Sequence, residues 1–235
     1  MKPGRGLEVA TWLAQPGRYL AVLVLTLMSF LFLAAGPDED WAPLVAIAIQ
    51  GATLLLALST SRVNPRLIRL ARALVLLSLV VAAATLFASS TDSRAAGYVA
   101  NGLLVALAPP AIAAGLVRQM RAQGGVTAQT VFGALSIYVL LGMFFATVYL
   151  AVNQLTGEPF FTSEPSPTPP DFQYFSFVTL TTTGYGDLTA ASNLGRTLAI
   201  SEALLGQIYL VTVVAALVAN IQRRDIRGHD PGRTG

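Results

Sequence analysis

Six apolar stretches dominate this chain, and each is close to the length that a helix needs to cross a lipid bilayer. About 20 residues of α-helix span roughly 30 Å of hydrocarbon. The stretches are residues 19–35, 41–59, 67–88, 98–117, 126–152 and 194–221. Only 11% of the residues are charged, against about 25% in an average soluble domain. The sequence therefore predicts an all-α integral membrane protein with six transmembrane helices.

The basic residues gather at one end of these predicted helices. Of the 15 Lys and Arg residues, only Arg94 and Arg196 fall on the opposite side. Acidic residues occupy the opposite loops, namely Asp38, Glu39, Asp40, Asp92, Glu158, Glu164 and Asp171. Because cytoplasmic loops carry an excess of Lys and Arg, we expect a multi-pass protein of the plasma or inner membrane with both termini in the cytoplasm. The expected partner is the lipid bilayer, and not nucleic acid.

Two features have alternative interpretations. Residues 19–35 resemble a signal peptide, because the letters FLAAG look like a cleavage site. A retained helix is favoured, since the segment 1–18 is long for a signal and losing this helix would upset the topology. Arg66, Arg69 and Arg72 recur at the spacing of a voltage-sensing helix, but they occupy only the cytoplasmic mouth of the third stretch. Charges there cross little of the membrane field, so we expect weak or absent voltage dependence.

The loop between the last two predicted helices has two parts. The letters GEPFFTSEPSPTPP, from residue 157, are rich in proline and predict an exposed, non-helical segment. The letters DFQYFSFVTLTTT, from Asp171, are aromatic and apolar but too short to cross a bilayer. They predict a re-entrant half-helix with Asp171 as its N-cap.

The string TTTGYGD, residues 181–187, follows this half-helix on the predicted outer side. A cation that enters a membrane loses its water, and backbone carbonyls can replace the lost oxygens when several point the same way. Gly184 and Gly186 supply the unusual backbone angles that this requires. The Thr182 hydroxyl would add an oxygen at the inner end. The C-terminal dipole of the half-helix would stabilise the cation.

The string closely resembles the selectivity filter of tetrameric potassium channels, in which backbone carbonyls replace the hydration shell of the ion. The resemblance covers about residues 128–221 and includes ALLGQIYLVTVVAALVAN, which is similar to the family's inner helix. It implies a six-helix, bacterial-type member without a cytosolic regulatory domain. It also implies passive K⁺ conduction without enzyme activity, and no cofactor other than K⁺ as permeant ligand.

The resemblance assigns three groups of residues by position. The ion-binding filter is Thr182, Thr183, Gly184, Tyr185 and Gly186, with K⁺ at the first four. Asp187 and Tyr174 are the filter-support residues. Glu202 joins them for a different reason: it is an acid inside an apolar helix, and we expect it to pack behind the filter with a hydrogen-bonding partner. The gating residues are Gly206, Leu210, Val214 and Val218. Gly206 is equally well explained as a packing residue.

Three departures from the family pattern concern the filter's surroundings. Thr183 replaces the usual valine, and its side chain should point away from the ions. Tyr174 and Phe175 replace a frequent tryptophan pair. Val178 stands where some members carry a glutamate. The resemblance therefore leaves open how this filter is anchored.

The chain carries one filter string, whereas enclosing an ion takes four. We therefore expect a C4 homotetramer, each chain with three further copies of itself as partners. The predicted domains are a cytoplasmic segment 1–18, a peripheral domain 19–121 without a full set of voltage-sensor arginines, a pore domain 122–221 and a tail 222–235. The pore domain divides into outer helix 126–152, turret 153–170, pore helix 171–181, filter 182–187 and inner helix 194–221.

Three competing functions remain beside a K⁺-selective channel. They are a weakly selective cation channel on the same scaffold, a potassium transporter subunit and a non-conducting membrane subunit. An enzyme is disfavoured, because no Ser/His/Asp set, metal-ligand cluster or phosphate loop is visible. No motif specifies a gating stimulus.

Overall fold

The protein's computed structural model describes residues 18–35, 42–60, 65–87, 102, 105–118, 120 and 127–228. Its helices are α2 (Arg18–Ala34), α3 (Ala42–Thr60), α4 (Pro65–Phe87), an unlabelled helix (Val105–Arg118), α6 (Ala128–Thr156), α7 (Pro169–Leu180) and α8 (Asn193–Gly228). The predicted segment 1–18 lies outside the described residues except for its last residue. Parts of the predicted fourth helix and of the tail also lie outside them.

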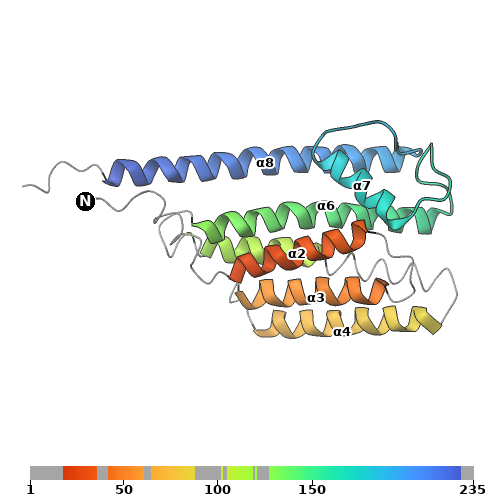
Figure 1. The fold of residues 1–235 in the computed structure, drawn as a ribbon, viewed down its shortest axis with the longest axis horizontal. Helices are drawn as coiled ribbons and strands as arrows, with labels where there is room; N and C mark the ends of the chain where they lie inside the picture. Colours follow the sequence, from red (N-terminus) through yellow and green to blue (C-terminus); the bar gives the residue numbers. More distant parts are fainter. Residues whose placement is uncertain are drawn as a thin grey trace, which may run out of the picture.

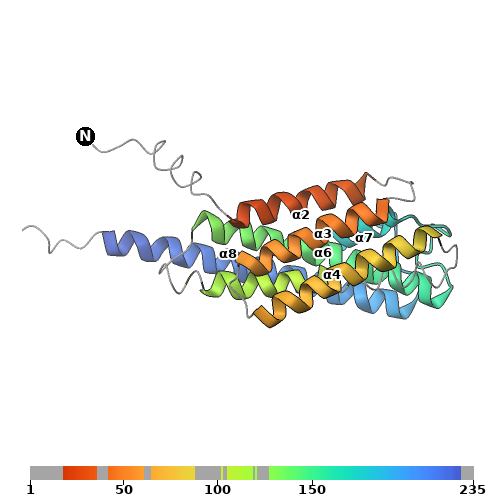
Figure 2. The same cartoon turned by 90° about the horizontal axis from the view of Figure 1, so that it is seen from below.

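The helices form a bundle in which short α7 bridges two long helices (Figure 1). α7 packs against both α6 and α8, near the C-terminal end of α6 and the N-terminal end of α8. On the other side of α6, α2 packs against α6 and α3, and α3 packs against α4. Figure 1 shows α4 farthest from α8 along this series of helices, and the two overlap in Figure 2 because that view is from below. The architecture is therefore a layered set of helices with α7 tucked in at one end.

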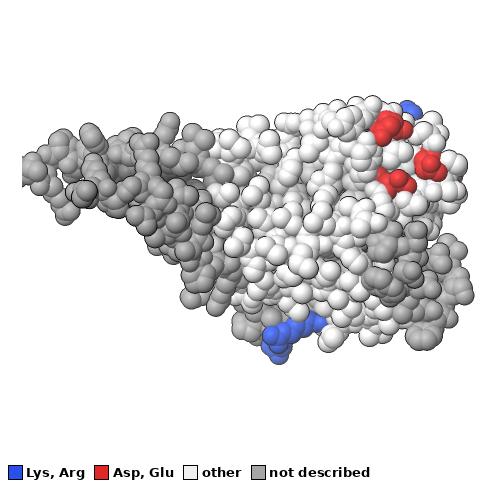
Figure 3. All heavy atoms as spheres, in the orientation of Figure 1, with Lys and Arg blue, Asp and Glu red and all other residues white. Residues whose placement is uncertain are grey.

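Within the described residues, two helices are long and apolar enough to cross a membrane. They are Ala128–Thr156, with a mean hydropathy of 2.2, and Asn193–Ala216, with 1.8. Three further apolar helices are shorter, at Tyr19–Ala34, Leu44–Ser59 and Val105–Arg118. Figure 3 shows acidic side chains near α7, with a basic one beside them, whereas Arg69 and Arg72 lie on the early turns of α4.

Several helix ends differ from the sequence prediction. α6 ends at Thr156 and not at residue 152, and the ends of α7 and α8 differ as well. We expected Asp171 to be the N-cap of α7, and this prediction is wrong. Thr168 is the N-cap, and the Asp171 carboxylate sits in the first turn and accepts from the Thr168 N–H at 2.7 Å. Pro169 and Pro170 can start the helix because the first-turn N–H groups have no intrahelical partner. α8 also runs to Gly228, past the predicted end at residue 221.

The segment 157–170 is not wholly exposed, contrary to expectation. Phe160 and Phe161 are 3% and 2% exposed and pack with Tyr149, Phe172 and Phe175 in an aromatic cluster. Contacting rings of these five residues have centroids 5.0 to 5.9 Å apart, a spacing typical of aromatic pairs in protein cores. The cluster fastens the loop before α7 to both α6 and α7. An isolated antiparallel bridge from Phe161 to Ala190 ties it to the segment after the filter.

α7 is also tied to α2, far away in the sequence. The buried Gln173 amide donates to the Phe30 carbonyl at 2.9 Å across a separation of 143 residues. The rings of Phe30 and Phe177 meet edge to face at 4.7 Å. The first described helix therefore braces the half-helix directly.

Glycines let α7 approach both of its long neighbours. A Cβ on Gly142 of α6 would lie 2.7 Å from the Phe177 ring. A Cβ on Gly206 of α8 would collide with the carbonyl oxygen of Leu180, the last residue of α7. Contacts this short leave no room for a side chain, so α7 is wedged between two helix surfaces.

Gly142→Leu should destabilise the fold by about 1–3 kcal/mol, because it overpacks the contact with Phe177. Thermal unfolding in detergent measures the effect. Ala52→Leu is the matched control, since it adds a similar apolar group on an exposed position of α3. Equal unfolding temperatures for the two variants would contradict the close packing of α6 on α7.

Candidate ion-binding site

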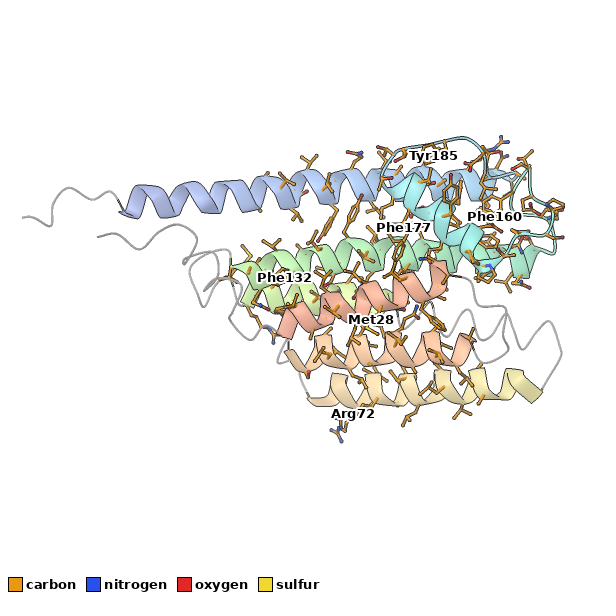
Figure 4. All side chains as sticks on the ribbon, viewed as in Figure 1. Met28, Arg72, Phe132, Phe160, Phe177 and Tyr185 are labelled. Atoms are coloured by element: carbon orange, nitrogen blue, oxygen red, sulfur yellow. The ribbon has the colours of Figure 1, made fainter. Side chains whose placement is uncertain are left out.

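The predicted filter follows α7 as an extended segment at the surface of the single chain. Residues 181–187 are all exposed, and Tyr185 is 71% exposed. Figure 4 shows Tyr185 near the N-terminal half of α8, on the side of α7 that faces away from α2, α3 and α4. Nothing in the described part of the chain covers this segment.

The backbone of the filter alternates in handedness. Thr182, Gly184 and Gly186 have φ values of 57°, 58° and 81°. Thr183 and Tyr185, between them, are not among the positive-φ residues. A β-branched residue with positive φ is a genuine outlier, and it costs about 1–3 kcal/mol unless the surroundings enforce it. The surroundings of Thr182 must therefore hold it in place.

Hydrogen bonds to α7 supply that restraint. Three consecutive filter N–H groups donate back to the last turn of α7: Thr182 to the Thr179 carbonyl at 2.9 Å, Thr183 to that of Val178 at 2.9 Å, and Gly184 to that of Val178 at 3.4 Å. In a trans peptide the N–H lies opposite the carbonyl of the preceding residue. The carbonyls of Thr181, Thr182 and Thr183 therefore point away from the α7 carbonyls to which these N–H groups donate.

The inner end of the filter contacts α8 through a residue that sequence reasoning missed. The Gln207 amide donates to the Thr182 hydroxyl at 2.9 Å, and that hydroxyl donates to the Thr181 carbonyl at 2.7 Å. The Thr182 oxygen keeps one lone pair, because a hydroxyl oxygen has two. Gln207 directly follows Gly206, and its polar character inside an apolar stretch was the available signal.

The outer end of the filter is anchored by Tyr174 and Asp187. The Tyr174 hydroxyl donates to the Asp187 carboxylate at 2.8 Å, and the rings of Tyr174 and Tyr185 stack at 6.4 Å. The Ser163 hydroxyl donates to the Asp187 carbonyl at 2.7 Å. The bond from Tyr174 lowers the pKa of Asp187 below its ordinary value. Tyr174 therefore anchors Asp187 in a chain that has neither the tryptophan pair nor the glutamate at these positions.

Behind the filter, Glu202 of α8 lies fully buried between α6 and α7. Its carboxyl oxygens meet the Tyr149 hydroxyl and the Ser176 hydroxyl, each at 2.5 Å. The sequence indicated a buried Glu202 with a hydrogen-bonding partner, but it did not name either partner. Tyr149 and Ser176 are 53 and 26 residues away, and no spacing pattern links such positions.

The four predicted gating residues have different surroundings. Gly206 is buried against the Leu180 carbonyl, which favours a packing role. Leu210 and Val214 are 47% and 52% exposed in the single chain. The Val218 side chain lies outside the described residues. No group of His, Cys, Asp or Glu suited to a metal occurs among the described residues.

Comparison with known proteins supports an ion-channel module in this part of the chain. Residues 137–223 match a family described as "Ion channel". Part of the chain is 39% identical over 93 residues to Protein LctB of Geobacillus stearothermophilus, a match that covers 37% of this chain and 66% of that protein, slightly under two thirds. No solved structure matches. The matched range holds most of α6, all of α7, the filter segment and most of α8.

The family match and the two long apolar helices together support a membrane location and a role in ion transport. The matched range includes residues 181–187, of which Thr182, Thr183 and Gly184 donate their N–H groups to the last turn of α7. The match does not extend to α2, α3 or α4.

Tyr174→Phe should raise the pKa of Asp187 toward the ordinary Asp value of about 3.9. Because the pKa of Asp187 is lowered, the bond from Tyr174 to the Asp187 carboxylate is fully present at pH values above the ordinary Asp pKa. It is lost as the pH falls through the lowered pKa of Asp187. ¹³C NMR titration of Asp carboxyls in detergent measures the midpoint, with Asp187→Asn identifying the signal. Tyr209→Phe is the control, because its hydroxyl bonds the Ala134 carbonyl instead. An unchanged midpoint in Tyr174→Phe would rule out this anchor.

Proposed function

We propose that the chain is one subunit of a potassium-selective channel that conducts K⁺ passively across the membrane. The observation that carries the proposal is the set of consecutive carbonyls turned away from α7 by the N–H bonds of Thr182, Thr183 and Gly184. Carbonyl oxygens at close, regular spacing can replace the hydration shell of K⁺. The left-handed Gly184 and Gly186 allow the same arrangement to continue through Tyr185. In this proposal K⁺ binds at Thr182, Thr183, Gly184 and Tyr185.

Four chains are proposed to complete the site. One chain offers a single extended segment, whereas a K⁺ filter uses four. The same side of the chain exposes apolar side chains of α8 at helical spacing, with Ile200, Leu204, Ile208 and Val211 between 58% and 65% exposed. In a C4 ring, part of this stripe would pack against neighbouring copies and Tyr185 would be enclosed. The occupant proposed for this surface is therefore a second copy of the chain.

The proposed membrane topology has six spans and both termini in the cytoplasm. The distribution of charge supports it, since acidic side chains outnumber basic ones near α7 and Arg69 and Arg72 lie on the early turns of α4. Because α4 carries no charged residue after Arg72, we propose weak or absent voltage dependence.

The decisive experiment uses purified protein in liposomes with opposed K⁺ and Na⁺ gradients. The reversal potential should follow K⁺. A potential intermediate between the two ions would favour the weakly selective channel. Absence of current would favour the non-conducting subunit. Native mass spectrometry in detergent should give four chains, and a monomer would revive the transporter subunit.

Gly184→Asp should abolish K⁺ flux, because it places an acidic side chain on a left-handed position between the proposed carbonyl rings. Gly157→Asp is the matched control. Gly157 has a φ of 68°, close to the 58° of Gly184, and neither has an atom within 4 Å of an added Cβ. The backbone strain is therefore similar, and only the location differs. Radiotracer uptake into liposomes measures both, and equal uptake would contradict the proposed filter.

A further inference from the structure

Glu202 is the one acidic side chain among the described residues that is fully buried. Its exposed fraction is 0%, and its neighbours Tyr149 and Ser176 are also at 0%. It lies in the apolar helix Asn193–Ala216, between α6 and α7. An isolated carboxylate in such surroundings is very costly. The cost of burying the charge therefore depends on whether Glu202 is protonated.

Counting hydrogens answers that question from the geometry. The Ser176 hydroxyl has one hydrogen, yet two potential acceptors surround it, the Gly142 carbonyl at 2.7 Å and a Glu202 oxygen at 2.5 Å. The Tyr149 hydroxyl spends its hydrogen on the other Glu202 oxygen. If Glu202 is a carboxylate, one of these contacts has no hydrogen. If Glu202 is protonated, each of the three contacts has a hydrogen.

The charged and titratable groups around Glu202 offer no substitute for that proton. From α6, Tyr149 is bonded to it and Tyr138 lies within electrostatic range. From α7 the facing group is the neutral Ser176. On α8, Arg196 donates to the Ala190 carbonyl and Tyr209 to that of Ala134. Within the described part of the chain, no Lys or Arg bonds to Glu202.

We propose that Glu202 is protonated at neutral pH and acts as a hydrogen-bond donor that positions the filter. The hydrogens then run in one direction, from Tyr149 to Glu202, from Glu202 to Ser176, and from Ser176 to the Gly142 carbonyl. A neutral carboxylic acid held in an apolar site for this purpose has precedent in enzymes. The chain of bonds joins α6, α7 and α8 at one point.

The effect on conduction rests on the proposed function. α7 ends directly before the filter, so a bond that fixes α7 between its neighbours also fixes the filter. Loss of the Glu202 proton would place a bare charge beside Ser176 and leave one contact without hydrogen. Conduction should therefore fall as the pH rises into the alkaline range.

Infrared spectroscopy of the full chain tests the protonation without any ion flux. ¹³C-glutamate labelling shifts the carbonyl stretch of a protonated Glu, a band that carboxylates lack. Exposed Glu side chains ionise near a pH of about 4.3. A labelled band that persists at neutral pH and disappears in Glu202→Gln supports the proposal. Absence of the band in the labelled wild type at neutral pH overturns it, even if no variant folds.

Flux measurements test the positioning role. Glu202→Ala should lower K⁺ flux by about tenfold or more, because it breaks a buried polar network. Glu202→Gln should restore it to within about twofold of wild type, because an amide can donate to Ser176 and accept from Tyr149. The Gln variant should also lose the alkaline decline. A Gln variant that is as defective as Ala, or that keeps the decline, contradicts the positioning role.

The two outcomes separate this inference from the proposed function. A neutral-pH band in a protein that conducts no K⁺ would leave the protonation intact and refute the channel. A protein that conducts K⁺ but lacks the band would support the channel and refute the protonation of Glu202.

Discussion

The last turn of α7 is the constraint on which the site depends. Its free carbonyls, which every helix C-terminus leaves without intrahelical partners, accept the N–H groups of the residues that follow. Those bonds force Thr182 into a left-handed conformation that a threonine would otherwise avoid. They also decide which way the next carbonyls point. A helix that ended one residue earlier or later would turn the peptide groups differently.

The rest of the bundle serves to hold α7 at one depth and one angle. Glycines on α6 and α8 admit it closely, and Thr168 and Asp171 close its first turn reciprocally. The aromatic cluster holds the loop that leads into it. Interiors packed at this density do not deform gradually, so a half-helix restrained from several sides has one position. This rigidity is what a site made of backbone atoms requires, since backbone atoms cannot adjust by changing rotamers.

Much of this arrangement followed from the sequence, and the remainder did not for identifiable reasons. Hydropathy predicted the approximate ranges of α2, α3, α4, α6 and α8, because burial in lipid is written into consecutive residues. The filter residues were predicted from a string with a known relative. Asp171 was predicted to be the N-cap but is the third residue of α7, because the paired prolines before it were interpreted as loop. The burial of Phe160 and Phe161 and the partners of Glu202 and Thr182 depend on how distant helices meet, which no local pattern records.

The bond between Gln173 and the Phe30 carbonyl has a consequence for the order of synthesis. Its two ends are 143 residues apart, so α2 leaves the ribosome long before α7 exists. The surface of α2 that receives α7 must stay accessible while the intervening helices are made and inserted. Contacts this distant in sequence slow folding, because the chain entropy is lost before they form. The half-helix can therefore reach its final position only after Leu180, its last residue, has been translated.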